Sequence, residues 1–135
     1  MPSLSAFAGP WLLARTIDDR LSGRPGRFEG RATFTPDAEG LRYEEEGLLT
    51  LADAPPLRAA RAYLWRPDGD GITVLFADGR PFHRFTGTGQ GTDHPCGADL
   101  YRVAYDVSRW PAWSATWTVT GPAKDYVMAT RYARP

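Results

Sequence analysis

Residues 27–35 read Arg-Phe-Glu-Gly-Arg-Ala-Thr-Phe-Thr, and an apolar or small residue occupies every second position. Phe28, Gly30, Ala32 and Phe34 therefore share one face of an extended strand, and the charged and hydroxyl-bearing side chains share the other. A period of two is typical of a strand that has one face in a core and one in water. This stretch predicts an antiparallel sheet.

The same alternation recurs along the chain, in segments separated by Gly, Asp and Pro, and no amphipathic helix of useful length appears. Short turns of this kind join antiparallel neighbours, so the topology predicted is a meander of about nine or ten strands. The nine strands that the alternation marks cover residues 11–18, 27–35, 41–51, 57–66, 72–76, 82–86, 99–106, 112–120 and 125–133. The clearest turns lie at residues 23–26, 36–40, 68–71, 78–79 and 121–122.

A meander of this length leaves two unpaired edge strands, and closure into a barrel removes both. We therefore predict one all-β domain over residues 1–135, a single antiparallel up-and-down β-barrel. Two segments allow other interpretations. Residues 57–63, rich in Ala, Leu and Arg, are compatible with one or two helical turns, and the glycine-rich residues 87–97 are compatible with a mobile loop or lid.

The charge balance of the 135-residue chain argues against two classes of partner. Sixteen Lys and Arg residues oppose sixteen Asp and Glu residues, so no global field attracts nucleic acid or an anionic membrane. No run approaches the roughly 20 apolar residues of a membrane-crossing helix. Cys96 is the only cysteine and the first nine residues lack a signal-peptide pattern, so we expect a cytoplasmic protein.

The face expected to point into the barrel contains polar groups that a plain core does not tolerate. Arg15, Glu45 and Arg61 fall in phase with the apolar residues of their strands. A buried, unpaired charge is strongly unfavourable, so these groups must pair with each other, with water or with a ligand. Two interpretations stay open. One is an internal ion pair, Glu45 with Arg15 or Arg61, that plugs the barrel, and the other is a ligand site.

Three hypotheses for function follow. The first is a barrel that binds a small amphipathic anion, with an internal Arg on its carboxylate and aromatic side chains along the rest. The candidate ligand-binding residues are Arg15, Glu45, Arg61, Tyr63, His83, Tyr101, Trp117 and Tyr126. The second is a small lyase or decarboxylase using Glu45, Tyr63 or His83, in which burial raises the pKa of Glu45 toward neutrality. The third is a protein-interaction module with a filled barrel and an apolar patch outside. Both a monomer and a homodimer fit these hypotheses.

His83, His94 and Cys96 lie close together in the sequence. With Asp93 or Asp99 they offer imidazole, thiolate and carboxylate groups, which are ordinary zinc ligands, but their spacing fits no established metal pattern. Cys96 beside either histidine is also conceivable as a nucleophile and base. We favour the simpler interpretation, in which His83 hydrogen-bonds a strand neighbour and Cys96 is a small buried apolar residue. We therefore expect no metal and no cofactor, and we assign no catalytic residue.

Gly9-Pro10-Trp11 opens the first predicted strand and resembles the Gly-x-Trp motif of lipocalin-type (calycin) barrels. In that family the Trp closes one end of the barrel and an Arg from the last strand packs across its ring. The resemblance implies that Arg131 or Arg134 packs on Trp11 here, so Gly9, Trp11, Arg131 and Arg134 are the candidate structural residues.

Residues 77–83, 94–105 and 117–126 resemble an uncharacterised bacterial and fungal branch of the same superfamily, a domain of unknown function. This resemblance implies a calycin fold with a small-molecule cavity and says nothing of chemistry. Haem-binding calycins of the nitrobindin kind use a His near the C-terminus, and the last strands here contain none, so no haem is expected.

Overall fold

Eleven strands and one short 3-10 helix make up the computed structural model, which describes all residues from 1 to 135. The helix η1 (Leu4–Phe7) comes first. The strands that follow are β1 (Gly9–Asp19), β2 (Pro25–Asp37), β3 (Gly40–Leu51), β4 (Leu57–Asp68), β5 (Gly71–Phe76), β6 (Pro81–Phe85), β7 (Gly89–Gln90), β8 (His94–Cys96), β9 (Asp99–Asp106), β10 (Trp113–Gly121) and β11 (Lys124–Ala133). No helix has the length and apolarity needed to cross a membrane.

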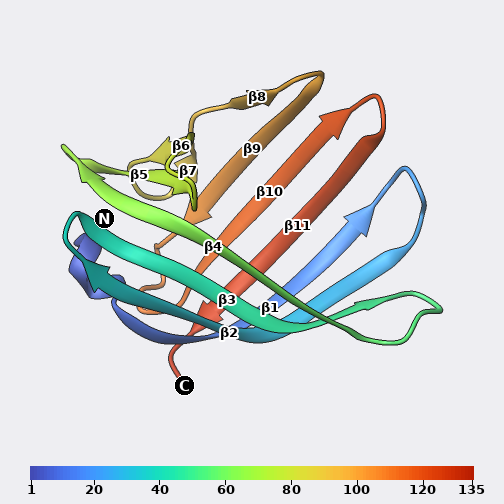
Figure 1. The fold of residues 1–135 in the computed structure, drawn as a ribbon, viewed down its shortest axis with the longest axis horizontal. Helices are drawn as coiled ribbons and strands as arrows, with labels where there is room; N and C mark the ends of the chain where they lie inside the picture. Colours follow the sequence, from blue (N-terminus) through green and yellow to red (C-terminus); the bar gives the residue numbers. More distant parts are fainter.

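The strands form one antiparallel sheet that curls into a nearly closed barrel (Figure 1). Ten strands lie on one path in the order β6-β5-β4-β3-β2-β1-β11-β10-β9-β7, and β8 pairs separately with β9. The predicted all-β, up-and-down barrel is confirmed. The helical alternative for residues 57–63 is wrong, because this segment pairs with β3 along its length and its Ala and Leu residues gain more from that ladder than from a short helix.

Residues 87–97 are not one long loop, because they contain β7 and β8 and contribute to the barrel wall. The mobility expected of this segment stays a prediction. β6 lies at one end of the strand order and β9 next to the other end, and the two approach each other where the barrel closes. They do not pair with each other as neighbouring strands. Between them the backbone N–H of Gly91 donates to the carbonyl of Val103 on β9, at 2.8 Å, and that of Thr92 donates to the carbonyl of Arg84 on β6, at 2.9 Å. We call this junction, residues 89–92, the seam.

Two glycines allow the wall to curve. Gly30 on β2 and Gly47 on β3 lie opposite each other in the antiparallel register. A Cβ on Gly30 would lie 2.0 Å from the carbonyl oxygen of Glu46, and one on Gly47 would lie 2.2 Å from that of Glu29. The two backbones therefore approach more closely than any side chain permits, which is a common device for bending a sheet into a barrel.

One end of the barrel is closed by η1. Phe7 and Trp11 are fully buried there, and the indole N–H of Trp11 donates to the Phe7 carbonyl at 2.8 Å. The guanidinium of Arg134 lies 3.7 Å from the centre of the Trp11 ring and donates to the carbonyls of Ala6, Ala8 and Pro10. Arg134 is thus the residue that packs on the tryptophan, whereas Arg131 is exposed on the outer face of β11.

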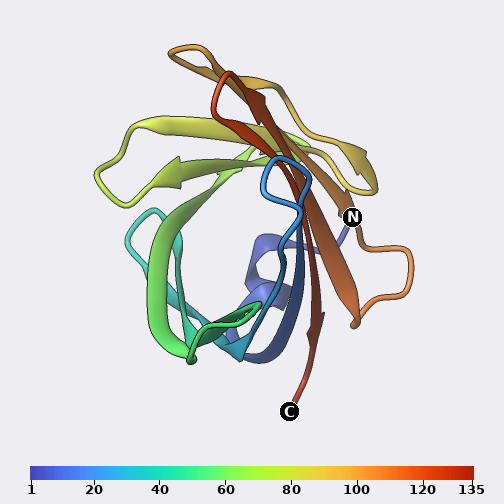
Figure 2. The same ribbon diagram turned by 90° about the vertical axis from the view of Figure 1, so that its right-hand side faces the viewer.

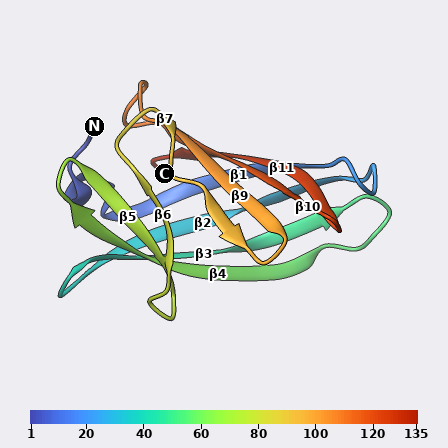
Figure 3. The same cartoon turned by 90° about the horizontal axis from the view of Figure 1, so that it is seen from above.

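The other end carries the β1–β2, β3–β4 and β10–β11 turns and has no plug; in Figure 2 it faces the viewer, with η1 across the far end. β5 pairs with β4 only from Tyr63 onward, so the first half of β4 has a neighbour on one side only (Figure 3). Inward-facing residues here remain partly exposed. We call this end the mouth and define it by Leu49, Leu57, Arg61, Trp117 and Tyr126.

Candidate functional site

A buried ion pair spans the barrel interior. Arg15 on β1 reaches across β2 to Glu45 on β3, and its two terminal nitrogens each lie 2.8 Å from one carboxylate oxygen. The Nε–H of Arg15 donates to the hydroxyl of Thr130 on β11 at 2.7 Å. All three side chains are buried. The crossing is possible because Ala32, the β2 residue opposite Glu45, leaves space between the two charged groups.

Two tyrosines extend the ion pair into a chain of hydrogen bonds. The hydroxyl of Tyr43 donates to Glu45 at 2.6 Å, and the hydroxyls of Tyr43 and Tyr132 lie 2.8 Å apart. Because a carboxylate can only accept, Tyr43 gives its single proton to Glu45 and Tyr132 must donate to Tyr43. Burial raises the pKa of Tyr132 to about 12 and that of Tyr43 well above its ordinary value, so both hydroxyls stay protonated.

Glu45 is held as a carboxylate. Burial by itself raises its pKa, but hydrogen bonds and the charge of Arg15, together with the Tyr43 hydroxyl and the charge of Arg61, outweigh burial and lower it. The expectation that burial would raise the pKa of Glu45 toward neutrality is therefore wrong. The sequence predicted an ion pair between Glu45 and either Arg15 or Arg61 as one of two interpretations. The interior contains this ion pair, and Arg15 is the arginine that hydrogen-bonds Glu45.

Arg61 differs from Arg15 in having no hydrogen-bond partner. It lies directly opposite Glu45 in the β3–β4 register, yet its Nε is 3.8 Å from the nearest Glu45 oxygen. Its side chain is 39% exposed, and its guanidinium lies 5.5 Å from the centre of the Trp117 ring on β10. Arg61 therefore brings a positive charge and unused donors to the mouth.

Trp117, on which this guanidinium lies, belongs to a larger group of aromatic side chains. Six of them form a continuous group, with neighbouring ring centres between 4.7 and 6.5 Å apart. We call this group the aromatic cluster; its members are Tyr63, Phe76, Phe82, His94, Tyr101 and Trp117. All except Phe82 are half-buried, so the cluster presents ring surface to solvent.

A second cation at the mouth is already neutralised. The Nζ of Lys124 lies 2.9 Å from the hydroxyl of Tyr101 and 3.1 Å from the carboxylate of Asp99, and these two contacts raise its pKa. Tyr126 lies half-buried on the same strand, and burial raises the pKa of its hydroxyl. Arg61 is thus the mouth cation whose nearest carboxylate, on Glu45, lies beyond hydrogen-bond distance.

Beside the aromatic cluster lies a small interior cavity of about 30 Å³. That volume holds about two water molecules and no larger ligand. Its polar lining comes from the buried network and from His83, and its other walls are aromatic or aliphatic; the polar residues are Arg15, Tyr43, Glu45, Tyr63, His83, Tyr105 and Tyr132. The deep interior is therefore almost filled by the protein's own side chains.

His83 is buried beside this cavity in its neutral form. Its Nε2 lies 2.6 Å from the hydroxyl of Tyr105 on β9, across the seam, and its Nδ1 has no partner. Burial, with a smaller contribution from the charge of His94, lowers the pKa of His83 to about 3. The partner is thus not on a strand that pairs with β6, as the sequence suggested, but across the closure of the barrel.

The sequence neighbours His83, His94 and Cys96 do not assemble into a site. No three or more His, Cys, Asp or Glu side chains in the structure are arranged to hold a metal ion. Cys96 is exposed at the end of β8, which corrects its interpretation as a buried apolar residue, and it forms no hydrogen bond with either histidine. No base therefore activates it as a nucleophile.

The eight candidate ligand-binding residues fall into two groups. Arg15 and Glu45 belong to the buried network with His83 behind it, whereas Arg61, Tyr63, Tyr101, Trp117 and Tyr126 gather at the mouth. Three features were missing from the sequence-based candidates: the Thr130 hydroxyl, the Tyr43–Tyr132 pair, and the contribution of Phe76, Phe82 and His94 to the aromatic cluster. Strand alternation carries the signal for the two tyrosines, because both share the inward phase of their strands.

Comparisons with known proteins agree with the fold of the barrel. Residues 7–134 match the sequence profile of a family of unknown function, DUF6314. No curated protein sequence matches the chain. Among solved structures, the barrel is similar to the S-type phycobiliprotein lyase CPES from Guillardia theta, with a TM-score of 0.63 and 8% identity over 98% of this chain and 90% of that one. At this identity the likeness shows a shared fold.

Proposed function

The chain belongs to the DUF6314 family, and we propose that it binds a small amphipathic anion at the mouth of its barrel. In this proposal the guanidinium of Arg61 holds the acidic group of the ligand, and the ring or chain of the ligand lies on the aromatic cluster. One observation carries the proposal: Arg61 faces inward on the ring of Trp117 and has no hydrogen-bond partner.

The charges of the interior support an anionic ligand. Arg15 and Glu45 cancel, as do Lys124 and Asp99, which leaves Arg61 as one net positive charge beside a half-buried aromatic surface. Carboxylates suit a guanidinium because they accept two parallel hydrogen bonds from it. A monoanion would neutralise this charge and use its donors.

The cavity volume argues that such a ligand lies outside the buried network. Pockets for small molecules have volumes of roughly 300–1,000 Å³, and the interior cavity has about 30 Å³. The ligand would therefore rest on the half-buried rings of Tyr63 and Trp117 and on the partly exposed leucines of the mouth. Arg15 and Glu45 then support the wall and do not contact the ligand.

A lyase or decarboxylase remains a second candidate because the similar solved structure is, by its title, a phycobiliprotein lyase. The state of Glu45 gives this candidate less support. Its carboxylate already accepts hydrogen bonds from Arg15 and Tyr43, and its lowered pKa makes it a poor general acid. The cytoplasm remains the proposed compartment, since the fold contains one free cysteine and no disulfide.

Binding of the aromatic anion 1-anilinonaphthalene-8-sulfonate tests the proposal. We expect the wild type to bind this probe and Arg61→Gln to weaken binding at least about tenfold. We expect little change in stability, because Arg61 is half-exposed and forms no hydrogen bond with Glu45. Arg58→Gln is the matched control, since Arg58 lies on the same strand and faces outward.

Equal binding by Arg61→Gln and wild type would contradict the role of Arg61. Equal binding of the uncharged analogue N-phenyl-1-naphthylamine would contradict an anion site. Turnover of an added carboxylic acid with a bell-shaped pH profile would favour the enzyme instead.

A further inference from the structure

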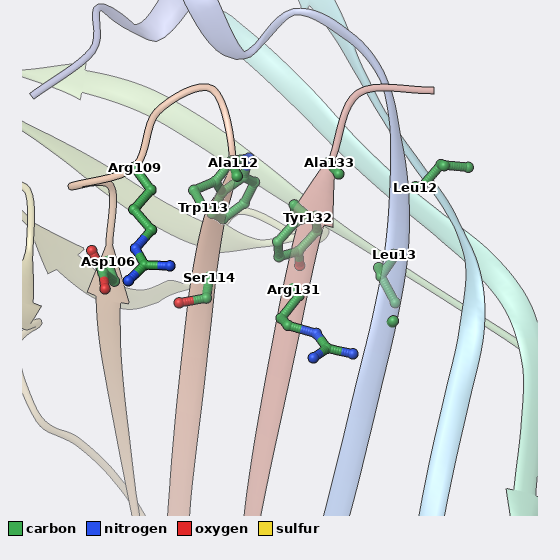
Figure 4. A pocket seen from close by; sticks show the side chains of 11 residues that line it. Leu12, Leu13, Asp106, Arg109, Ala112, Trp113, Ser114, Arg131, Tyr132 and Ala133 are labelled. Atoms are coloured by element: carbon green, nitrogen blue, oxygen red, sulfur yellow. The ribbon is translucent and has the colours of Figure 1, made fainter.

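An open groove lies on the outer wall of the barrel. It has a volume of about 570 Å³, crosses β10, β11 and β1, and is bordered by the β9–β10 loop (Figure 4). Its floor is apolar because the outward positions of these strands carry mostly small residues near the closed end. The floor residues are Leu12, Ala14, Ala112 and Ala133, and Leu12 is 43% exposed.

Two arginines flank this floor. Arg109, from the β9–β10 loop, and Arg131, on β11, both line the groove. Arg109 lies beside Asp106, and its charge helps to lower the pKa of that carboxyl. The groove's one carboxylate, on Asp106, accepts hydrogen bonds from the backbone N–H and the hydroxyl of Ser108, at 2.9 and 2.5 Å. The groove thus combines an exposed apolar floor with an excess of positive charge.

The position of the groove favours a protein partner over a small molecule. A bound small molecule usually buries most of its surface. This groove is open on the outside of the barrel, and Leu12 on its floor is nearly half exposed. A partner chain would cover the floor from above. The filled interior and the apolar outer groove are also the two features expected of an interaction module.

A second copy of this chain fits the groove poorly. A twofold symmetric contact places the same surface of both copies face to face. Each copy would bring two arginines and one carboxylate to such a contact, so the interface would hold an excess of positive charge, which is unfavourable.

We propose that the groove binds an extended acidic segment of a partner protein, with a carboxylate between Arg109 and Arg131 and a neighbouring apolar side chain on Leu12. Guanidinium groups recognise carboxylates with paired hydrogen bonds, which gives this contact direction as well as charge. The groove lies on the outer surface of the barrel wall, whereas the aromatic cluster faces the interior at the mouth. The groove therefore acts independently of the proposed ligand site.

Selection from a displayed library of random octapeptides, with the full chain as bait, tests the proposal. We expect the selected peptides to share an Asp or Glu next to Leu, Ile or Phe. A synthetic peptide of the selected sequence should bind the double variant Arg109→Gln/Arg131→Gln at least about tenfold more weakly than wild type. Arg24→Gln/Arg58→Gln removes two unpaired arginines elsewhere on the surface, so it controls for net charge.

Several results would overturn the proposal: no enrichment of acidic peptides, equal binding to the Arg109→Gln/Arg131→Gln variant, or equal weakening by Arg24→Gln/Arg58→Gln. Dimerisation in sedimentation experiments that Leu12→Ser abolishes would assign the groove to a second copy instead. Leu12→Ser also provides a test that leaves both arginines in place, and we expect it to weaken the selected peptide while the fold persists.

Discussion

The buried His83 makes the stability of this barrel depend on pH in a window where few other groups titrate. In the unfolded chain its pKa is near 6.5, and in the folded barrel burial lowers it to about 3. Between these values the unfolded state binds a proton that the folded state excludes. Folding stability therefore falls as the pH falls below 6.5 and is retained above that value.

The size of the effect follows from the two pKa values. Each pH unit in the window corresponds to about 1.4 kcal/mol, so lowering the pH from 7 to 5 should remove about 2 kcal/mol from the free energy of unfolding. The carboxyl groups that have shifted pKa values, such as Glu45, are shifted downward and titrate mainly below this range. His83 should therefore dominate the change between pH 5 and 7.

The assay is urea unfolding at pH 5, 6 and 7, followed by tryptophan fluorescence. His83→Gln keeps a hydrogen-bonding side chain toward Tyr105 but cannot bind the proton, so its stability should be nearly flat over this range. The matched control is His94→Gln, which removes the other histidine and leaves the contact between His83 and Tyr105 in place. A His83→Gln protein that still loses about 2 kcal/mol between pH 7 and 5 would refute the reasoning.

Two further predictions concern the frame of the barrel, and both are measured as the free energy of unfolding in urea. Arg134→Ala should destabilise by about 2 kcal/mol, because it removes a guanidinium from the Trp11 ring and from three carbonyls. Arg131→Ala, at a position three residues earlier on β11 that has no partners, should stay within about 0.5 kcal/mol of wild type; similar losses in both variants would argue against the stabilising role of the Arg134 contacts. Gly30→Ala should cost at least about 2 kcal/mol, since the added Cβ meets a backbone oxygen at 2.0 Å. A neutral effect would show that β2 and β3 can separate at this point.

Period-two alternation was sufficient to predict the long strands, because one-sided burial imprints it on residues such as Phe28 and Phe34. It did not mark β7 and β8, which are two and three residues long and too short to show a period. It also placed Arg15, Glu45 and Arg61 inside the barrel. It could not show which arginine pairs with Glu45, since that depends on how β1 and β3 face each other across β2.

Two other properties depend on closure of the barrel and are invisible in local sequence. His83 meets Tyr105 only because the seam brings β6 to β9, and nothing in the residues around either side chain specifies the other. Arg61 remains half-exposed because β5 begins to pair with β4 at Tyr63, and a longer β5 would have covered it. Sequence patterns specify which face of the sheet a residue occupies. How exposed that residue is depends on the lengths of the neighbouring strands.

The pairing of β1 with β11 has a consequence for folding during synthesis. β1 forms ladders with β2 and with β11, and more than 100 residues separate β1 from the second partner. On the ribosome β1 keeps an open edge until the final strand emerges, because no other strand can occupy that position. A chain that stops before β11 exposes unpaired edges on both β1 and β10, which are templates for aggregation. The last ten residues of the sheet therefore also protect the newly made protein from its neighbours.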